Sequence, residues 1–225
     1  MIYSWTYVIL IPAMLFALYA QMQVKTAYKK YSRVRSASGM TGASTARALL
    51  DKAGLRGIDI GVVPGQLTDH YDPRRKALFL SKDIYYGDAI ASLGIAAHEA
   101  GHAIQDGVGY NPMKLRAAIV PVANIGSSAA WPLFLIGLFF QNSMFMNIGI
   151  LFFSFAVVFQ VVTLPVEFNA SKRAVVLLSE NGIITGQESI MVKKVLSAAA
   201  LTYVAATATA ILQLLQLVIM RGERN

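Results

Sequence analysis

Three long stretches without a charged residue dominate the pattern of hydrophobic and polar positions. They cover residues 1–24, 117–166 and 195–220. One helix needs roughly 20 residues to cross a bilayer, so the 50-residue middle stretch is too long for a single pass. The polar cluster Gln141–Asn147 lies near its centre and predicts a tight turn there. We therefore predict four transmembrane helices: an uncleaved N-terminal anchor, a hairpin and a C-terminal helix.

Basic residues are concentrated in the polar segments between these stretches. Of the 20 Lys and Arg residues, 14 lie within residues 25–116, four within 167–194 and two after Met220. Cytoplasmic loops of membrane proteins carry an excess of Lys and Arg, so we place both segments at the cytoplasmic face of the cell membrane. This topology accounts for the net charge of +8 without a nucleic-acid partner. Since the chain has no cysteine, disulfides and thiolate metal sites are excluded.

The segment 25–116 has the pattern of a small α+β domain that follows the membrane anchor. Turn-forming residues separate its apolar stretches, and most of them fall within residues 64–76. The expected elements are a helix capped by Thr41 or Ser44 and ended by Gly54, strands at 58–63 and 77–81, and a helix over 89–105 capped by Asp88 and ended by Gly107. The predicted fold class is a mainly α membrane protein with a small α+β cytoplasmic domain.

The last of these helices carries the most specific motif in the chain, H-E-x-x-H. His98 and His102 are four residues apart, so on a helix they lie one turn apart on the same face and can bind one metal ion. Glu99 points to the side, where it can act as general base on a metal-bound water. This pattern predicts a site for one catalytic zinc ion, with Glu99 as the catalytic residue.

A catalytic zinc site needs a third protein ligand. Val108 stands where a metzincin would carry its third histidine, and Asp106 is better explained as a residue at the helix end. His70 and Glu167 remain. Topology favours Glu167, because two membrane crossings return the chain to the side of the membrane that holds the H-E-x-x-H motif. A carboxylate at the bilayer edge is costly unless a partner such as zinc compensates its charge.

Three motifs resemble those of the YugP-type membrane zinc metallopeptidases. They read "LTDHYDPRRKALFLS", "SLGIAAHEAGHAIQD" and "LPVEFNASKRA", and they occur in the expected order. More distantly, the layout is similar to HtpX and the CAAX prenyl endopeptidases, which implies a gluzincin-like catalytic domain with Glu167 as third ligand. In those relatives an Asp stands where this chain has Ser171, and an Asp there would orient a ligand histidine.

The expected function is that of a membrane-anchored zinc metalloendopeptidase that cleaves a polypeptide, such as a membrane protein, at the cytoplasmic face. In this protease class the substrate usually pairs with the strand ahead of the zinc helix, here residues 77–81. His70 or Tyr71 could then contact the transition-state oxyanion, with Asn169 and Arg173 as weaker candidates.

Two alternatives predict different sites. A site-2-type intramembrane protease would carry the H-E-x-x-H motif inside a membrane-spanning helix. A non-catalytic zinc-binding membrane scaffold would fill all four zinc positions with protein ligands, and His70 would have to be the fourth.

Overall fold

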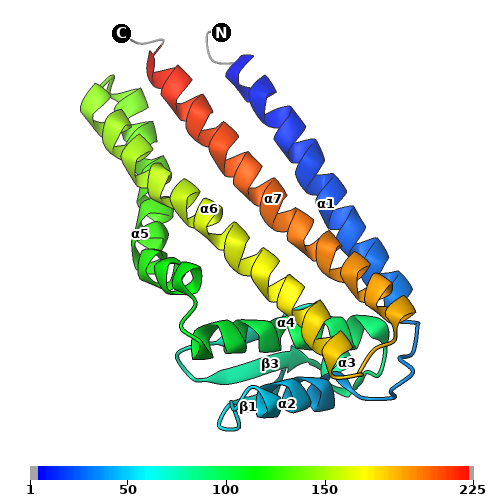
Figure 1. The fold of residues 1–225 in the computed structure, drawn as a ribbon. Coiled ribbons are helices and arrows are strands. Elements are labelled where there is room, and N and C mark those ends of the chain that lie inside the picture. The colour runs from blue at the N-terminus through cyan, green and yellow to red at the C-terminus, as the bar shows by residue number, and fades with distance from the viewer. Residues whose placement is uncertain (1–4, 223–225) are drawn as a thin grey trace. The chain divides into compact units, whose positions relative to one another are not determined.

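The structure, a computed structural model, describes residues 5–222 (Figure 1). Helices predominate, and three short strands form one sheet. In chain order the elements are η1 (Trp5–Ile9), α1 (Leu10–Tyr31), α2 (Gly42–Lys52), β1 (Asp59–Val63), β2 (His70–Asp72), β3 (Ala77–Ser81), α3 (Lys82–Tyr86), α4 (Ile90–Gly107), α5 (Asn111–Phe139), α6 (Ser143–Glu180) and α7 (Gly186–Gly222).

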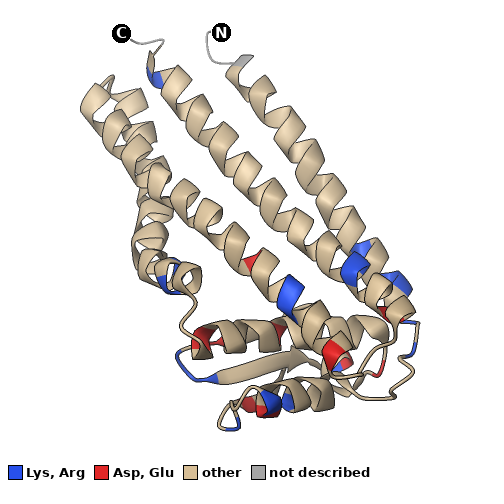
Figure 2. Ribbon diagram, in the orientation of Figure 1, with Lys and Arg blue, Asp and Glu red and all other residues tan. Residues whose placement is uncertain are grey.

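Four helical segments within the described range are long and apolar enough to cross a membrane: Thr6–Tyr31, α5, α6 and α7. Charged residues are absent from long stretches of these helices (Figure 2). The predicted class, mainly helical with four candidate membrane spans and a small sheet, is confirmed. Helices α6 and α7 extend beyond the uncharged stretches, so residues 167–194 form the end of α6, a short turn and the start of α7.

Contacts within the chain divide it into two compact units. The helical unit comprises the residues up to Gln21, Lys114–Pro165 and the residues from Thr202 onward. The mixed unit comprises Met22–Met113 and Val166–Leu201, and it contains the whole sheet. The H-E-x-x-H motif and Glu167 both belong to the mixed unit.

Close helix packing in the helical unit depends on glycine. A Cβ atom added at Gly149 on α6 would lie 2.8 Å from the Ala130 carbonyl oxygen of α5.

The turn between α5 and α6 is shorter than the predicted polar cluster Gln141–Asn147, because α6 already begins at Ser143. The Asn142 side chain explains this start, since its Oδ1 accepts hydrogen bonds from the first backbone N–H groups of the helix, as an N-cap does.

The sheet of the mixed unit has the strand order β1-β3-β2, with β3 in the centre. Strand β3 pairs in parallel with β1 and antiparallel with β2. The predicted pairing of substrate with the edge of residues 77–81 is contradicted for Ala77–Phe79, because these residues are paired on both sides, whereas β2 does not extend to Leu80 and Ser81. The pattern missed β2, which has three residues and lies inside the turn-rich segment.

The sequence predicted the ends of α2 correctly, but it did not predict those of α4. Thr41 caps α2 through its side chain, and Gly54 follows the helix with a positive φ of 76°, as expected. Asp88 does not cap α4: the N-cap is Ala89, and the Asp88 carboxylate accepts a hydrogen bond from Arg35 Nε at 2.8 Å. Gly107 lies within α4, so the helix extends past the expected end.

Helix α4 lies in the core of the mixed unit. Ile90, Leu93, Ala96 and Ala97 are fully buried and belong to one apolar cluster with residues of α2, β3, α6 and α7. Gly101, within the H-E-x-x-H motif, lets α6 approach, because an added Cβ would lie 3.0 Å from the Ala170 carbonyl oxygen. This close approach brings the turn of α6 that carries the predicted third ligand next to the motif.

Candidate metal centre

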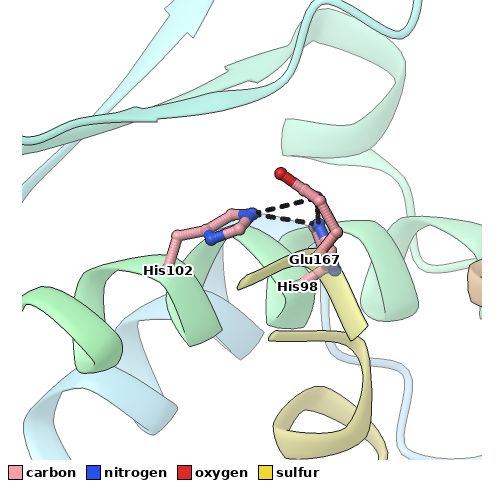
Figure 3. A group of neighbouring side chains, drawn as sticks. All are labelled: His98, His102 and Glu167. Atoms are coloured by element: carbon pink, nitrogen blue, oxygen red, sulfur yellow. Dashed lines mark hydrogen bonds and ion pairs between the residues drawn. The ribbon is translucent and has the colours of Figure 1, made fainter. Parts of the chain in front are cut away.

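Three side chains meet where α6 passes α4 (Figure 3). Nε2 of His98 lies 3.2 Å from Nε2 of His102. Oε2 of Glu167 lies 3.3 Å from the first of these nitrogens and 3.5 Å from the second. His102 and Glu167 are buried, with 8% and 2% of their surface exposed, so solvent shields this cluster of polar atoms poorly.

The spacing of these three donor atoms fits a zinc ion. Around tetrahedral zinc with bonds of about 2.0–2.1 Å, neighbouring donor atoms lie about 3.3 Å apart. Two imidazole nitrogens and a carboxylate are also ligands that zinc accepts. Lone pairs that converge at such distances repel one another unless a proton or a metal cation lies between them. His98, His102 and Glu167 could therefore bind a metal ion.

Each imidazole is also held through its other ring nitrogen. His102 Nδ1 contacts Oε1 of Gln105 at 3.0 Å, and His98 Nδ1 contacts Oγ of Ser171 at 3.1 Å. The Ser171 hydroxyl thus contacts a candidate ligand histidine from the position where the sequence resemblance implied an Asp. No role for Gln105 was predicted, although a polar residue three positions after His102 on a largely apolar helix was a usable signal.

The charge of Glu167 acts on His102. Burial disfavours the imidazolium and would lower the pKa of His102, but the hydrogen bond to Glu167 and the nearby carboxylate of Glu99 outweigh it. The pKa of His102 is consequently raised above its ordinary value. Glu99 is itself buried, with 8% of its surface exposed. The site thus collects negative charge that a cation would neutralise.

Asp69 lies within electrostatic reach of Glu99. Burial raises the pKa of Asp69, hydrogen bonds from Ser81 oppose this shift, and the Glu99 carboxylate adds to it. The Asp69 carboxylate accepts the Ser81 backbone N–H at 2.7 Å, which ties the start of β2 to the end of β3. This contact fixes the segment that leads into β2 to the end of β3.

The remaining sequence candidates do not join the three ligand atoms. Among residues 5–222, His70 is outside the ligand group; its exposed ring stacks on Phe79 and its Nδ1 contacts the Thr68 carbonyl oxygen at 2.8 Å. The Tyr71 hydroxyl donates to Asp106 Oδ2 at 2.7 Å, and neither residue belongs to the group of three candidate ligands.

Asn169 and Arg173, the weaker oxyanion candidates, also have partners. Arg173 Nε donates to Asn169 Oδ1 at 2.8 Å, and the same oxygen accepts a hydrogen bond from Gln105 at 3.0 Å. These contacts favour a supporting role for both residues.

Comparison with known proteins identifies the chain's relatives. A family model described as "Putative neutral zinc metallopeptidase" matches residues 6–222. The chain belongs to this zinc metallopeptidase family. It is 46% identical over 210 residues to the "Putative membrane protease YugP" of Bacillus subtilis (strain 168), and the match covers 93% of each chain. No solved structure matches the chain. The predicted resemblance to YugP-type proteins is confirmed.

Proposed function

We propose that this protein is a membrane-anchored zinc endopeptidase in which His98, His102 and Glu167 hold one zinc ion and Glu99 is the general base. The observation that carries the proposal is the convergence of the three donor atoms, 3.2–3.5 Å apart, beside the buried Glu99. Membership of the zinc metallopeptidase family supports zinc as the metal.

The chemistry divides between the metal and the chain. When bound, zinc would supply a Lewis acid that lowers the pKa of water and polarises the scissile carbonyl. Glu99 would accept the proton of the attacking water and pass it to the amine leaving group. The imidazoles of His98 and His102 and the carboxylate of Glu167 would hold the cation.

An extended polypeptide would bind along an edge of the sheet. Strand β2 is an edge strand that contacts α4, whereas β3 is central. Backbone groups on the outer side of β2 are available for strand addition, a common mode of peptide recognition. His70 begins this strand with an exposed side chain, so it is a candidate contact for the substrate.

Charge distribution supports an active site at the cytoplasmic face. The mixed unit contains most of the Lys and Arg residues, and such residues are enriched in cytoplasmic segments. Helix α4 is not among the four described segments that are long and apolar enough to cross a membrane, which disfavours a site-2-type arrangement. The three-member ligand group likewise disfavours a closed structural zinc site.

The test is the substitution Glu99→Gln, with Glu180→Gln as a control at an exposed carboxylate of the same unit. Loss of the general base should lower the rate of peptide cleavage by about 10²–10⁴-fold. Zinc content should stay at the wild-type level, because Glu99 is not a ligand. Both quantities are measured on detergent-purified protein, by elemental analysis and with a fluorogenic peptide library. Cleavage at the full rate by the Glu99→Gln variant would disprove the mechanism.

A further inference from the structure

Gln105 is completely buried, one turn after His102 on α4. Its side-chain amide makes three hydrogen bonds. Oε1 faces Nδ1 of His102 at 3.0 Å, while Nε2 donates to the Val166 carbonyl oxygen at 2.9 Å and to Asn169 Oδ1 at 3.0 Å. A buried amide with this many partners is strongly oriented, since rotation would break all three contacts.

The partners on α6 determine which way the amide points. The Val166 carbonyl is only an acceptor, so the group that faces it must be the NH₂ of Gln105. Asn169 Oδ1 is likewise an acceptor, because it also receives the hydrogen bond from Arg173 Nε at 2.8 Å. Oε1 of Gln105 is therefore the atom turned toward His102, and it can only accept.

This orientation selects the tautomer of His102. An acceptor at 3.0 Å from Nδ1 requires the proton on Nδ1, and it leaves the lone pair of a neutral ring on Nε2. Nε2 is the atom that faces His98 and Glu167. The Ser171 hydroxyl that contacts His98 can donate or accept, so it does not make the same selection.

The same amide bridges two helices that supply different ligands. Val166 and Asn169 flank Glu167 within one turn of α6, and Gln105 lies on α4 one turn from His102. The bridge links residues more than 60 positions apart in the chain. Because the amide holds both the imidazole and the turn that carries the carboxylate, it restricts the distance between the two ligands.

We propose that Gln105 is a positioning residue, which presets His102 for coordination through Nε2 and holds the Glu167 turn at ligand distance. The proposal rests on the proposed zinc site and adds a residue that acts on zinc through His102. Outer partners of this kind commonly change metal affinity by about 10–100-fold when they are removed.

The test compares Gln105→Met, Gln105→Glu and the control Gln187→Ala at an exposed glutamine of α7. Methionine keeps the length of the side chain but has no amide, so zinc affinity should fall by about 10–100-fold. Glutamate keeps an acceptor for His102 Nδ1 and loses the donors to α6, so its zinc affinity should lie between those of the methionine variant and wild type. Affinity is measured by competition with a chelator.

A second measurement separates positioning from loss of structure. The ¹⁵N chemical shifts of His102 in zinc-loaded protein should report Nε2 coordination in wild type and mixed coordination in the Gln105→Met variant, while the helical circular dichroism stays unchanged. Wild-type zinc affinity and an unchanged His102 spectrum in the Gln105→Met variant would overturn the proposal. Failure of wild-type protein to bind zinc would instead overturn the proposed function.

Discussion

The helical and mixed units differ in how their polar side chains connect the chain. In the helical unit, the hydroxyls of Thr163 and Thr209 donate to carbonyl oxygens one turn earlier on their own helices, and the Thr207 hydroxyl, which does the same, adds a longer contact of 3.4 Å to the Gln160 carbonyl oxygen of α6. In the mixed unit, polar side chains connect distant parts of the chain. Glu188 on α7, for example, accepts the backbone N–H of Ala37 at 2.7 Å across 151 positions of sequence.

This difference indicates which unit has to hold side chains from different elements at defined distances. Hydroxyls that bond within their own helix do not link it to its neighbours, so the helices pack by the fit of their surfaces. Small residues then allow close approach of the helices, as in a lipid environment. Bridges between segments hold groups from several elements at defined distances. The proposed zinc ligands need such control, because they come from two helices, and they lie in the mixed unit, where Gln105 and Glu188 form such bridges.

Replacement of a leucine by alanine should give the largest difference in unfolding free energy between the two units. Leu78 on β3 is fully buried in the mixed unit, whereas Leu151 on α6 is 55% exposed in the helical unit. Leu78→Ala should lower the free energy of unfolding by about 2–5 kcal/mol, because it leaves a cavity. Leu151→Ala should change it by about 0.5 kcal/mol or less. Urea unfolding in detergent, followed by circular dichroism, measures both, and equal losses would refute the contrast.

Added volume should destabilise the helical unit at its glycine contacts. Gly149→Ala places a methyl group 2.8 Å from the Ala130 carbonyl oxygen, and such overpacking costs roughly 1–3 kcal/mol. Gly222→Ala is the matched control, since nothing lies within 4 Å of its added Cβ. Thermal unfolding in detergent should show a lower midpoint for the Gly149 variant alone. An unchanged midpoint would show that α5 and α6 can separate freely.

The ion pair between Lys76 and Asp106, on the surface of the mixed unit, should make the smallest contribution to stability, and this contribution should depend on pH. Burial would raise the pKa of Asp106, but the hydrogen bonds from Lys76 and Tyr71 outweigh it and lower that pKa. A lowered carboxylate pKa contributes stability above its unfolded value, and this contribution is lost as pH falls through the folded value. Lys76→Met should therefore cost about 1 kcal/mol or less at pH 7.

Acid unfolding curves at several pH values test this expectation. The difference between wild type and the Lys76→Met variant should vanish once Asp106 is protonated in both states. High salt should also reduce it, because the Lys76 side chain is 60% exposed. A difference that persists at low pH would assign the effect to packing instead of charge.

Local spacing explains which predictions held. The separation of His98 and His102 by four residues determines their shared helix face in any α-helix. The Thr41 cap and the glycine at position 54 act within one turn, so both ends of α2 could be predicted. The four apolar helices could be predicted without any tertiary information, because the length of each uncharged stretch can be compared with the number of residues that cross a bilayer.

Contacts between distant segments explain what the pattern missed. The central place of β3 depends on β2, a strand too short to leave a periodic signal. Asp is a residue type that often caps helices, but the Asp88 carboxylate accepts a hydrogen bond from Arg35 instead. Gln105 is a buried polar residue whose three partners become visible only once α6 lies against α4.

By itself, the sequence determined which functional groups could form the site: two imidazoles and a general-base candidate on one helix, and a carboxylate that follows a predicted membrane hairpin. These follow from residue type, helical periodicity and the length of apolar stretches, which are local properties of a chain. Only the tertiary structure decided that the carboxylate reaches the imidazoles and that Gln105 and Ser171 hold their rings. The reason is packing, since the distance between α4 and α6 depends on the contact of Gly101 with Ala170. No local sequence pattern predicts a contact between residues so far apart in the chain.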